Sequence, residues 1–182
     1  AEHGRVDGLV NNAGIPFRAR LGEVTIEDWN RVIAINLTGP LLGIQTVAPL
    51  MTAGGSIVNV SSVAGLTAHF GVAYTTSKWG LRGLSRVASL ELGPRGIRVN
   101  TICPGYIATP MTASASEGFR RANLQETPLG RTGTVDEVAP LVLYLLSDES
   151  TYVSGVEIPI DGGLSAHGGT KSMSDAVRAP AV

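Results

Sequence analysis

Cysteine and charge are both scarce in this chain of 182 residues. The single cysteine, Cys103, excludes an internal disulfide, and because it ends an apolar alternation we expect a buried core thiol rather than a reactive one. Charged residues make up 16% of the chain and the net charge is −1, so there is no electrostatic basis for binding nucleic acid or an anionic membrane. We therefore expect a partner that is small and uncharged, or one that is bound by the backbone.

Long apolar runs and spaced metal ligands are also missing. No apolar run approaches the roughly 18 residues of a membrane span, and no basic and then apolar leader precedes Val6, which predicts a cytoplasmic protein without a membrane partner. His3, His69 and His167 share no ligand spacing, so we expect no metal site. The hydrophobic content of 43% excludes disorder by composition and allows one domain with a sizeable core.

Short apolar segments predict four β-strands, at residues 8–10, 56–60, 97–103 and 156–160. The first three end on small or polar residues, which are Asn11-Asn12-Ala13-Gly14, Ser61-Ser62 and Pro104-Gly105. The fourth contains Pro159, which cannot donate to a ladder on both sides and so predicts an outer strand.

Helical signals lie between these strands, over residues 29–51, from Tyr74 to a stop at Gly93-Pro94, and from a capping box at 134–137 through Leu146. Pro40 and Pro49 are expected to kink or end the first helix. Because strand and helix alternate, we predict an α/β fold with a mostly parallel sheet and helices on both faces. Ligands bind such sheets beyond the carboxyl ends of the strands, so three of the turns are predicted to converge on one crevice.

The remaining segments show no clear period. Residues 63–72 are small and apolar and could wall a pocket, in which His69 and Phe70 either line the substrate site or form only the tip of a loop. Residues 106–127 are the best candidate for a mobile lid, and residues 164–182 are expected to be an irregular tail. The whole chain, residues 1–182, is taken as a single domain.

The most informative pair is Tyr74 and Lys78, which are four residues apart and so share a helix face. An ammonium beside a phenol favours the phenolate. Tyrosine has an ordinary pKa of roughly 10, and lowering it by about three units corresponds to about 4 kcal/mol of differential stabilisation. Tyr74 would then act as an acid or base near neutral pH. Taken alone, such a pair is common on helices and specifies no chemistry.

The motifs together resemble one family, the short-chain dehydrogenases/reductases of the Rossmann type. They are Asn11-Asn12-Ala13-Gly14, Asn36 in an Asn-Leu-Thr-Gly context, Ser62, Tyr74-Thr75-Thr76-Ser77-Lys78, Asn100 with Pro104-Gly105, and Asp161-Gly162-Gly163. They occur in the family's order over nearly the whole chain. The segment Ser77-Lys78-Trp79-Gly80 and the tail after Gly163 are most similar to the bacterial hydroxysteroid and cyclic-alcohol dehydrogenases.

This resemblance implies a Rossmann-like, doubly wound fold and a catalytic tetrad. Tyr74 would exchange the proton, Lys78 would lower its pKa and hold the nicotinamide ribose, Ser62 would bind the substrate oxygen, and Asn36 would hold a water that relays protons to Lys78. The implied cofactor is NAD or NADP, with NAD slightly favoured. The residues that would bind it are Asn11, Ala13, Gly14, Tyr74, Lys78, Pro104, Gly105, Ile107 and Thr109.

The implied activity is the interconversion of a secondary alcohol and a ketone, with a small hydrophobic substrate of the steroid or cyclic-alcohol class. Reduction of a 3-oxoacyl thioester or a polyketide is an alternative within the family, and an inactive or structural fragment is an alternative outside enzymes. A homodimer or homotetramer is expected, because the helix from Trp79 to Leu92 carries small residues suited to close contact with a second copy.

The chain departs from the family pattern in two places. Ser62 lies twelve positions before Tyr74, one fewer than is usual, and Ser61 would satisfy the usual spacing. Ser62 is still preferred, because a residue lost from the loop changes less than a shift at a strand end, where neighbouring side chains point to opposite faces. The family's first three strands and a Gly-x-x-x-Gly-x-Gly turn are not found in these residues, so we expect the C-terminal portion of the fold.

Overall fold

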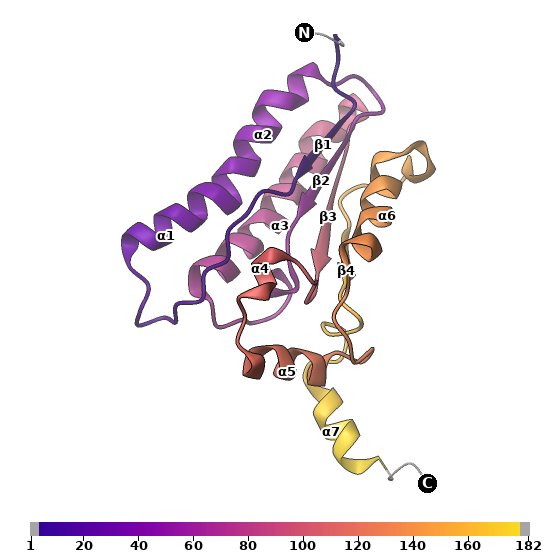
Figure 1. Ribbon diagram of the computed structural model, residues 1–182. Helices are drawn as coiled ribbons and strands as arrows, with labels where there is room; N and C mark the ends of the chain where they lie inside the picture. The colour runs from indigo at the N-terminus through magenta and orange to yellow at the C-terminus, as the bar shows by residue number, and fades with distance from the viewer. Residues whose placement is uncertain (1–3, 179–182) are drawn as a thin grey trace.

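The computed structural model describes residues 4–178 and contains a four-stranded parallel sheet in the order β1-β2-β3-β4 (Figure 1). The strands are β1 (Gly8–Asn11), β2 (Ser56–Val60), β3 (Arg98–Pro104) and β4 (Glu157–Ile160). Each lies within a residue of its predicted position, and β4 is an edge strand, as Pro159 indicated. The predicted α/β class is confirmed.

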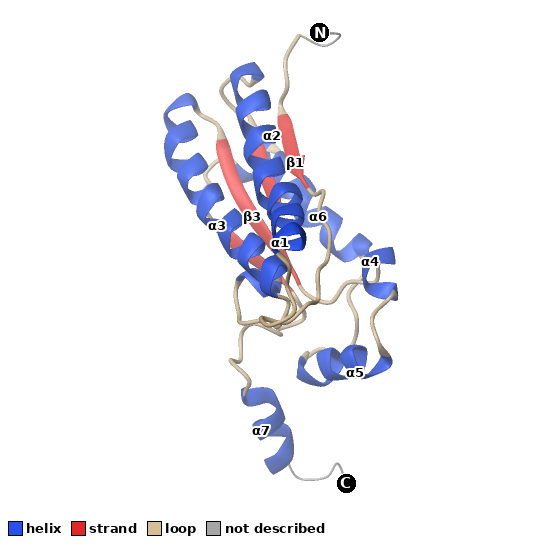
Figure 2. Ribbon diagram, turned by 90° about the vertical axis from the view of Figure 1, so that its left-hand side faces the viewer, coloured by secondary structure: helices blue, strands red, loops and turns tan. Residues whose placement is uncertain are grey.

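Helices cover both faces of the sheet (Figures 1 and 2). One face carries α1 (Ile26–Ile33), α2 (Gly39–Val47) and α3 (Val72–Leu92), and the other carries α6 (Val135–Leu146). Neighbouring residues of β2 point to opposite faces. Ile57 therefore joins a core with α2 and α3, whereas Val58 packs against Leu145 of α6.

The segment Ile26–Leu50 is one long helix that contains a π-helical turn at Ala34–Thr38. Its buried positions recur every fourth residue, at Val32, Asn36, Pro40, Ile44 and Ala48. This row faces the sheet and α3. Pro40 was expected to kink or end the helix, but the helix continues through it, because the wider turn just before it leaves room for the proline ring.

By length and composition alone, this helix could cross a membrane, since its most apolar window has a mean hydropathy of 1.4. Polar residues such as Asn36 and Gln45 interrupt it, so it contains no continuous apolar run of about 18 residues, although its mean hydropathy is high enough for a span. One side of the helix packs against β1 and α3.

Two segments are more regular than predicted. Residues 106–127 contain α4 (Pro110–Ala113) and α5 (Glu117–Glu126), in which the Ser116 hydroxyl accepts the Phe119 N–H at 3.2 Å. The tail contains α7 (Thr170–Val177), which contacts α5 and is stabilised by a Lys171–Asp175 ion pair of 2.5 Å one helical turn apart. The prediction of an irregular tail is therefore wrong for α7, and residues 179–182 lie outside the described chain. Single 3-10 turns complete the fold at Ala48–Leu50, Val63–Gly65, Gly93–Arg95 and Asp148–Ser150.

A chain of buried polar side chains links β1, β2 and α3. Asn11 Nδ2 donates to Asn59 Oδ1 at 2.7 Å, and Asn59 Nδ2 donates to Ser85 Oγ at 2.8 Å. Ser85 Oγ in turn donates to the Leu81 carbonyl at 2.7 Å. Because Asn59 is fully buried, each of these bonds replaces one with water and holds the strand against the helix.

We predict that Asn59→Ala lowers the free energy of unfolding by about 2–4 kcal/mol, because it opens a cavity and leaves the Asn11 amide and Ser85 hydroxyl without their partner. Urea denaturation measures the change. The matched control is Asn30→Ala on the exposed side of α1, which should change stability by less than about 0.5 kcal/mol. Equal effects of the two substitutions would contradict the prediction.

Candidate active site

The carboxyl ends of β1, β2 and β3 meet at a cleft of about 610 Å³. The cleft is lined by the turn Asn12–Gly14, residues 60–62, Tyr74 and Lys78 of α3, residues 104, 105, 107 and 109–112, and the first turns of α6. The crevice expected at this edge of the sheet is therefore present.

A smaller pocket of about 110 Å³ adjoins this cleft. Its walls include Phe17, Arg18, His69, Tyr106 and Phe119, none of which lines the larger cleft. Ser62 and Tyr74 line both, as do Gly105, Met111 and Thr112. The two candidate catalytic hydroxyls therefore lie on the boundary between a large cleft and a small pocket.

Tyr74 and Lys78 lie one turn apart on α3, as predicted, but their electrostatics differ from the expectation. The Lys78 ammonium lies 5.7 Å from the centroid of the Tyr74 ring, over the ring. Burial raises the pKa of the Tyr74 phenol, and a hydrogen bond with the Ser62 side chain lowers it by a smaller amount. The expectation of a phenol acidified by its lysine is wrong for this structure. Burial disfavours the charged phenolate more than the hydrogen bond with Ser62 favours it.

Lys78 is itself desolvated. Its side chain is buried, its Nζ donates to the Val60 carbonyl at 2.9 Å, and burial lowers its pKa to about 8. A Cβ at Gly14 would lie 3.6 Å from Lys78 Nζ and 3.3 Å from Asn36 Oδ1. Gly14 therefore lets the turn after β1 approach both side chains closely.

The two serines at the end of β2 have different surroundings. Ser61 is buried and its Oγ donates to the Lys78 carbonyl at 3.0 Å, so its hydroxyl fastens the strand end to α3. The Ser62 side chain accepts the Ala64 N–H at 3.1 Å and lowers the pKa of Tyr74. Of the two, only Ser62 lines both the cleft and the small pocket, which favours the choice made from the sequence.

Asn36 lies in the π-helical turn and lines neither pocket. Its Nδ2 donates to the Ile15 carbonyl at 3.0 Å and to Ser77 Oγ at 3.2 Å, and its Oδ1 accepts the Ile15 N–H at 2.8 Å. Ser77 Oγ donates to the Tyr74 carbonyl at 2.7 Å. Asn36 thus connects the turn after β1 to the first turn of α3. The π-helical turn, a feature often found at functional sites, was not predicted.

Most residues predicted to bind a cofactor do line the larger cleft, namely Ala13, Gly14, Tyr74, Lys78, Pro104, Gly105, Ile107 and Thr109. Asn11 does not. It is the last residue of β1, and its side chain points to Asn59 and to the backbone of Gly43, where a Cβ would lie 2.7 Å from Asn11 Oδ1. Strand alternation turns it away from the cleft that its three neighbours line.

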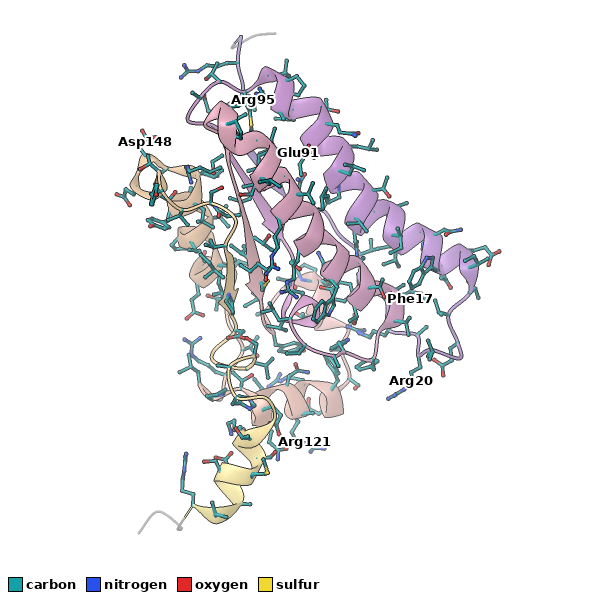
Figure 3. The ribbon with its side chains drawn as sticks, turned by 180° about the vertical axis from the view of Figure 1, so that it is seen from behind. Phe17, Arg20, Glu91, Arg95, Arg121 and Asp148 are labelled. Carbon is teal, nitrogen blue, oxygen red and sulfur yellow. The ribbon has the colours of Figure 1, made fainter. Side chains whose placement is uncertain are left out.

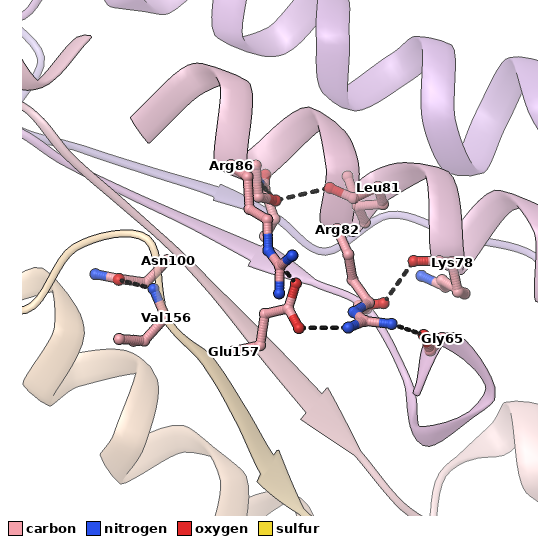
Figure 4. A network of polar contacts seen from close by, with 11 residues as sticks. Gly65, Lys78, Leu81, Arg82, Arg86, Asn100, Val156 and Glu157 are labelled. Carbon is pink, nitrogen blue, oxygen red and sulfur yellow. Dashed lines mark hydrogen bonds and ion pairs between the residues drawn. The ribbon is translucent and has the colours of Figure 1, made fainter. Parts of the chain in front are cut away.

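Asn100 and Asp161, which belong to two further motifs, do not line the larger cleft and instead stabilise segments next to β3 and β4. Asn100 Nδ2 donates to the Val153 carbonyl at 2.8 Å and its Oδ1 accepts the Val156 N–H at 3.2 Å, which ties β3 to the segment before β4 (Figure 4). Asp161 accepts the N–H groups of Gly163 and Ser165 and packs so closely on Gly105 that a Cβ there would lie 2.8 Å from its Cα. Cys103 is buried, as predicted, and burial raises its pKa to about 11.

An ion pair between Arg82 and Glu157 helps to join α3, β4 and the loop at Gly65 (Figure 4). Arg82 of α3 pairs with Glu157 of β4 at 2.5 Å and also donates to the Gly65 carbonyl in the loop after Ser62. The two side chains are mostly buried, and Arg86 lies 3.1 Å from the other Glu157 oxygen. This network fixes the loop that carries Ser62 against α3.

The sequence analysis did not predict most of the aromatic side chains at the small pocket. Phe119 of α5 packs edge-on against Tyr106, His69 and Phe70, with ring centroids 5.8–6.2 Å apart. These rings come from segments without a period, so no sequence pattern could bring them together. His69 lines the pocket, whereas Phe70 lines an adjoining groove. Within residues 4–178 no cluster of three His, Cys, Asp or Glu could hold a metal ion, and His3 lies outside that range.

Comparison with known proteins identifies the family. A protein-family model described as "Enoyl-(Acyl carrier protein) reductase" matches residues 1–165. The chain belongs to the short-chain dehydrogenase/reductase family. The resemblance that the motifs indicated is therefore confirmed.

Curated members of this family match 87–90% of the chain. The chain is 44% identical to trans-4-hydroxycyclohexanecarboxylate dehydrogenase of Sinomonas cyclohexanicum and spans 62% of that relative's length. It is 48% identical to the 3-oxoacyl-[acyl-carrier-protein] reductase of Thermotoga maritima and spans 68% of it. It is 45% identical to the 3-alpha-(or 20-beta)-hydroxysteroid dehydrogenase of Mycobacterium tuberculosis and spans 60% of it.

Solved structures of the family share the fold. A 4-hydroxyisoleucine dehydrogenase mutant complexed with NADH and succinate has a TM-score of 0.85 and 31% identity, over 91% of this chain and 70% of that one. A protein of Agrobacterium tumefaciens, provisionally assigned as 2-deoxy-D-gluconate 3-dehydrogenase and solved with bound NADP, has a TM-score of 0.84 and 34% identity, over 88% and 68% of the two chains.

The lowered pKa of Lys78 makes stability depend on pH. Between about 8 and the ordinary value of 10.5 the unfolded chain holds a proton that the folded protein has lost, so stability rises with pH in this window, and below it this group gives stability no pH dependence. We predict that the unfolding free energy of the wild type, relative to Lys78→Met, rises by up to about 3 kcal/mol over this range. Urea denaturation at several pH values tests this, and a difference that is flat or falls with pH would contradict it.

Proposed function

We propose that this protein is an NAD(P)-dependent oxidoreductase that interconverts a secondary alcohol and a ketone. The observation that carries the proposal is the position of Ser62 and Tyr74, whose side chains line both the large cleft and the small pocket. Hydride transfer requires the substrate carbon to lie against the nicotinamide ring, so the groups that hold the substrate oxygen must lie where the cofactor site meets the substrate site.

The larger cleft fits the nicotinamide half of a dinucleotide. The side chains of Lys78, Ser62 and Tyr74 line it, and Gly14 lets the turn after β1 lie close to the Lys78 ammonium. Ammonium and hydroxyl groups suit ribose hydroxyls, and backbone groups of residues 104–109 suit a carboxamide. NAD and NADP both remain candidates, since one structural neighbour was solved with NADH and another with NADP.

When bound, the nicotinamide supplies or accepts the hydride at the substrate carbon. Tyr74 gives a proton to the carbonyl oxygen in reduction and takes one from the hydroxyl in oxidation. Ser62 donates a hydrogen bond to the same oxygen. Lys78 holds the ribose, and its charge stabilises the phenolate that Tyr74 becomes. Asn36 supports this group by fastening Ile15 and Ser77.

The substrate is proposed to be a small hydrophobic or cyclic alcohol, because apolar and aromatic side chains line most of the small pocket. Reduction of a 3-oxoacyl thioester is the second candidate. A groove of about 730 Å³ next to the pocket, lined by His69 and Phe119 on their other side, favours it. Turnover of a panel of cyclic alcohols and 3-oxoacyl thioesters distinguishes the two candidate substrates. The cytoplasmic location expected from the sequence stays a prediction.

Catalysis by Tyr74 and Ser62 is tested by nicotinamide absorbance in the steady state. We predict that Tyr74→Phe and Ser62→Ala each lower kcat by about 100-fold or more, because each removes a group at the reacting oxygen. Ser61→Ala is the matched control and should keep most of the activity, since its hydroxyl bonds the Lys78 carbonyl. A larger loss of activity in Ser61→Ala than in Ser62→Ala would contradict the choice of Ser62 and assign the catalytic role to Ser61. Wild-type protein that turns over no alcohol or ketone would favour a structural fragment.

A homodimer or homotetramer is proposed through α3. Trp79, Val87 and Leu90 are exposed on one side of this helix, and nothing lies within 4 Å of a Cβ at Gly83. These four residues recur at spacings of three and four and so share a face. We predict that analytical ultracentrifugation finds a dimer or tetramer and that Leu90→Glu shifts it toward the monomer without loss of fold. A wild-type monomer would contradict the proposal.

A further inference from the structure

Arg18 gives the small pocket a charge that the reaction itself does not require. It is the only Arg or Lys among the pocket-lining residues, and within the described part of the chain none of these residues is Asp or Glu. Arg18 does not line the larger cleft, so it faces the proposed substrate rather than the proposed cofactor.

The Arg18 guanidinium has weak partners. Its Nη1 lies 3.5 Å from Ser114 Oγ, and its central carbon lies 6.0 Å from the centroid of the Phe119 ring. Among residues 4–178 it forms no ion pair. Because a guanidinium has five N–H donors, most of its capacity is left for a ligand.

The positive charge of Arg18 affects another side chain that lines the pocket. Burial lowers the pKa of the neighbouring His69, and the positive charge of Arg18 lowers it further, so His69 adds no second cation near neutral pH. The remaining walls are mainly aromatic or aliphatic. The pocket therefore combines a small apolar space, the two candidate catalytic hydroxyls at its boundary and one uncompensated cation.

This combination matches a specific class of substrate. We propose that the substrate is a hydroxy acid or the corresponding keto acid, with a small cyclic or branched body, and that Arg18 binds its carboxylate while Ser62 and Tyr74 hold the reacting oxygen. A planar guanidinium pairs with a carboxylate through two parallel hydrogen bonds, which fixes orientation as well as affinity. The inference rests on the proposed function and departs from the expectation of an uncharged partner.

The reaction is balanced without any change at the carboxylate. In oxidation the carbinol carbon loses a hydride to the oxidised nicotinamide dinucleotide, and the hydroxyl loses its proton to the Tyr74 phenolate. A carbon–oxygen double bond forms where the carbon–hydrogen and oxygen–hydrogen bonds break. Arg18 is thus a specificity-determining residue and takes no part in the proton or hydride transfer.

The test compares two substrates that differ only in charge, 4-hydroxycyclohexanecarboxylate and 4-hydroxycyclohexanecarboxamide. We expect Arg18→Gln to lower kcat/KM for the carboxylate by about 10- to 100-fold, mainly through KM, and to leave the carboxamide nearly unchanged. Arg18→Lys should recover part of the loss, because it keeps the charge but not the paired geometry.

Arg20→Gln is the matched control. Arg20 lies on the same loop between β1 and α1, which Figure 3 shows with Phe17 and Arg20 labelled, and its guanidinium lies 5.3 Å from the centroid of the Phe70 ring. It does not line the small pocket. Removing its charge should leave kcat/KM for both substrates within about twofold of wild type, so a general electrostatic effect of the loop is separated from binding by Arg18.

Three results would overturn the inference. One is equal kcat/KM for the two substrates in the wild type, and another is an equal loss on both in Arg18→Gln. The third is turnover of neutral alcohols such as cyclohexanol with none of the carboxylate, which would leave the proposed function intact. Absence of turnover with every alcohol and ketone would instead overturn the proposed function together with this inference.

Discussion

The parallel direction of β1, β2 and β3 determines where every candidate catalytic group of this protein lies. The three strands end at Asn11, Val60 and Pro104, at one edge of the sheet. The residues after those ends form the cleft, and the helix that follows β2 brings Tyr74 and Lys78 back to the same edge. Helices on both faces keep water from the sheet, so this edge is the place where polar side chains are both fixed and reachable.

Burial, rather than pairing, controls the charges at this edge. It raises the pKa of Tyr74 and lowers that of Lys78 to about 8, so both changes favour the neutral forms. The pKa of Lys78 therefore lies close to neutral pH. A bound anionic or hydroxyl-rich ligand would favour its charged form, and that form would in turn favour the Tyr74 phenolate. The acidity expected from the sequence is thus a property of the loaded site in this account.

The strands, the alternating order and the positions of Ser62, Tyr74 and Lys78 follow from local signals, namely apolar runs that end on small residues and a spacing of four on a helix. Other features arise from contacts that no local signal encodes. The Asn11 side chain is held away from the cleft by its bond to Asn59 of the neighbouring strand, the passage of the helix through Pro40 depends on a π-helical turn, and the ring of Phe119 reaches the pocket from a segment without a period. Arg18, in an unpatterned loop, belongs to this second group.

The central claim is that the cofactor cleft and the substrate pocket meet at the hydroxyls of Ser62 and Tyr74. A crystal structure of the protein with a nicotinamide dinucleotide and a ketone tests it most directly. The account predicts that the nicotinamide lies between Lys78 and residues 104–109 and that the ketone oxygen lies within hydrogen-bond distance of both hydroxyls. A ketone bound with its oxygen away from Tyr74, or a nicotinamide outside the cleft, would contradict it.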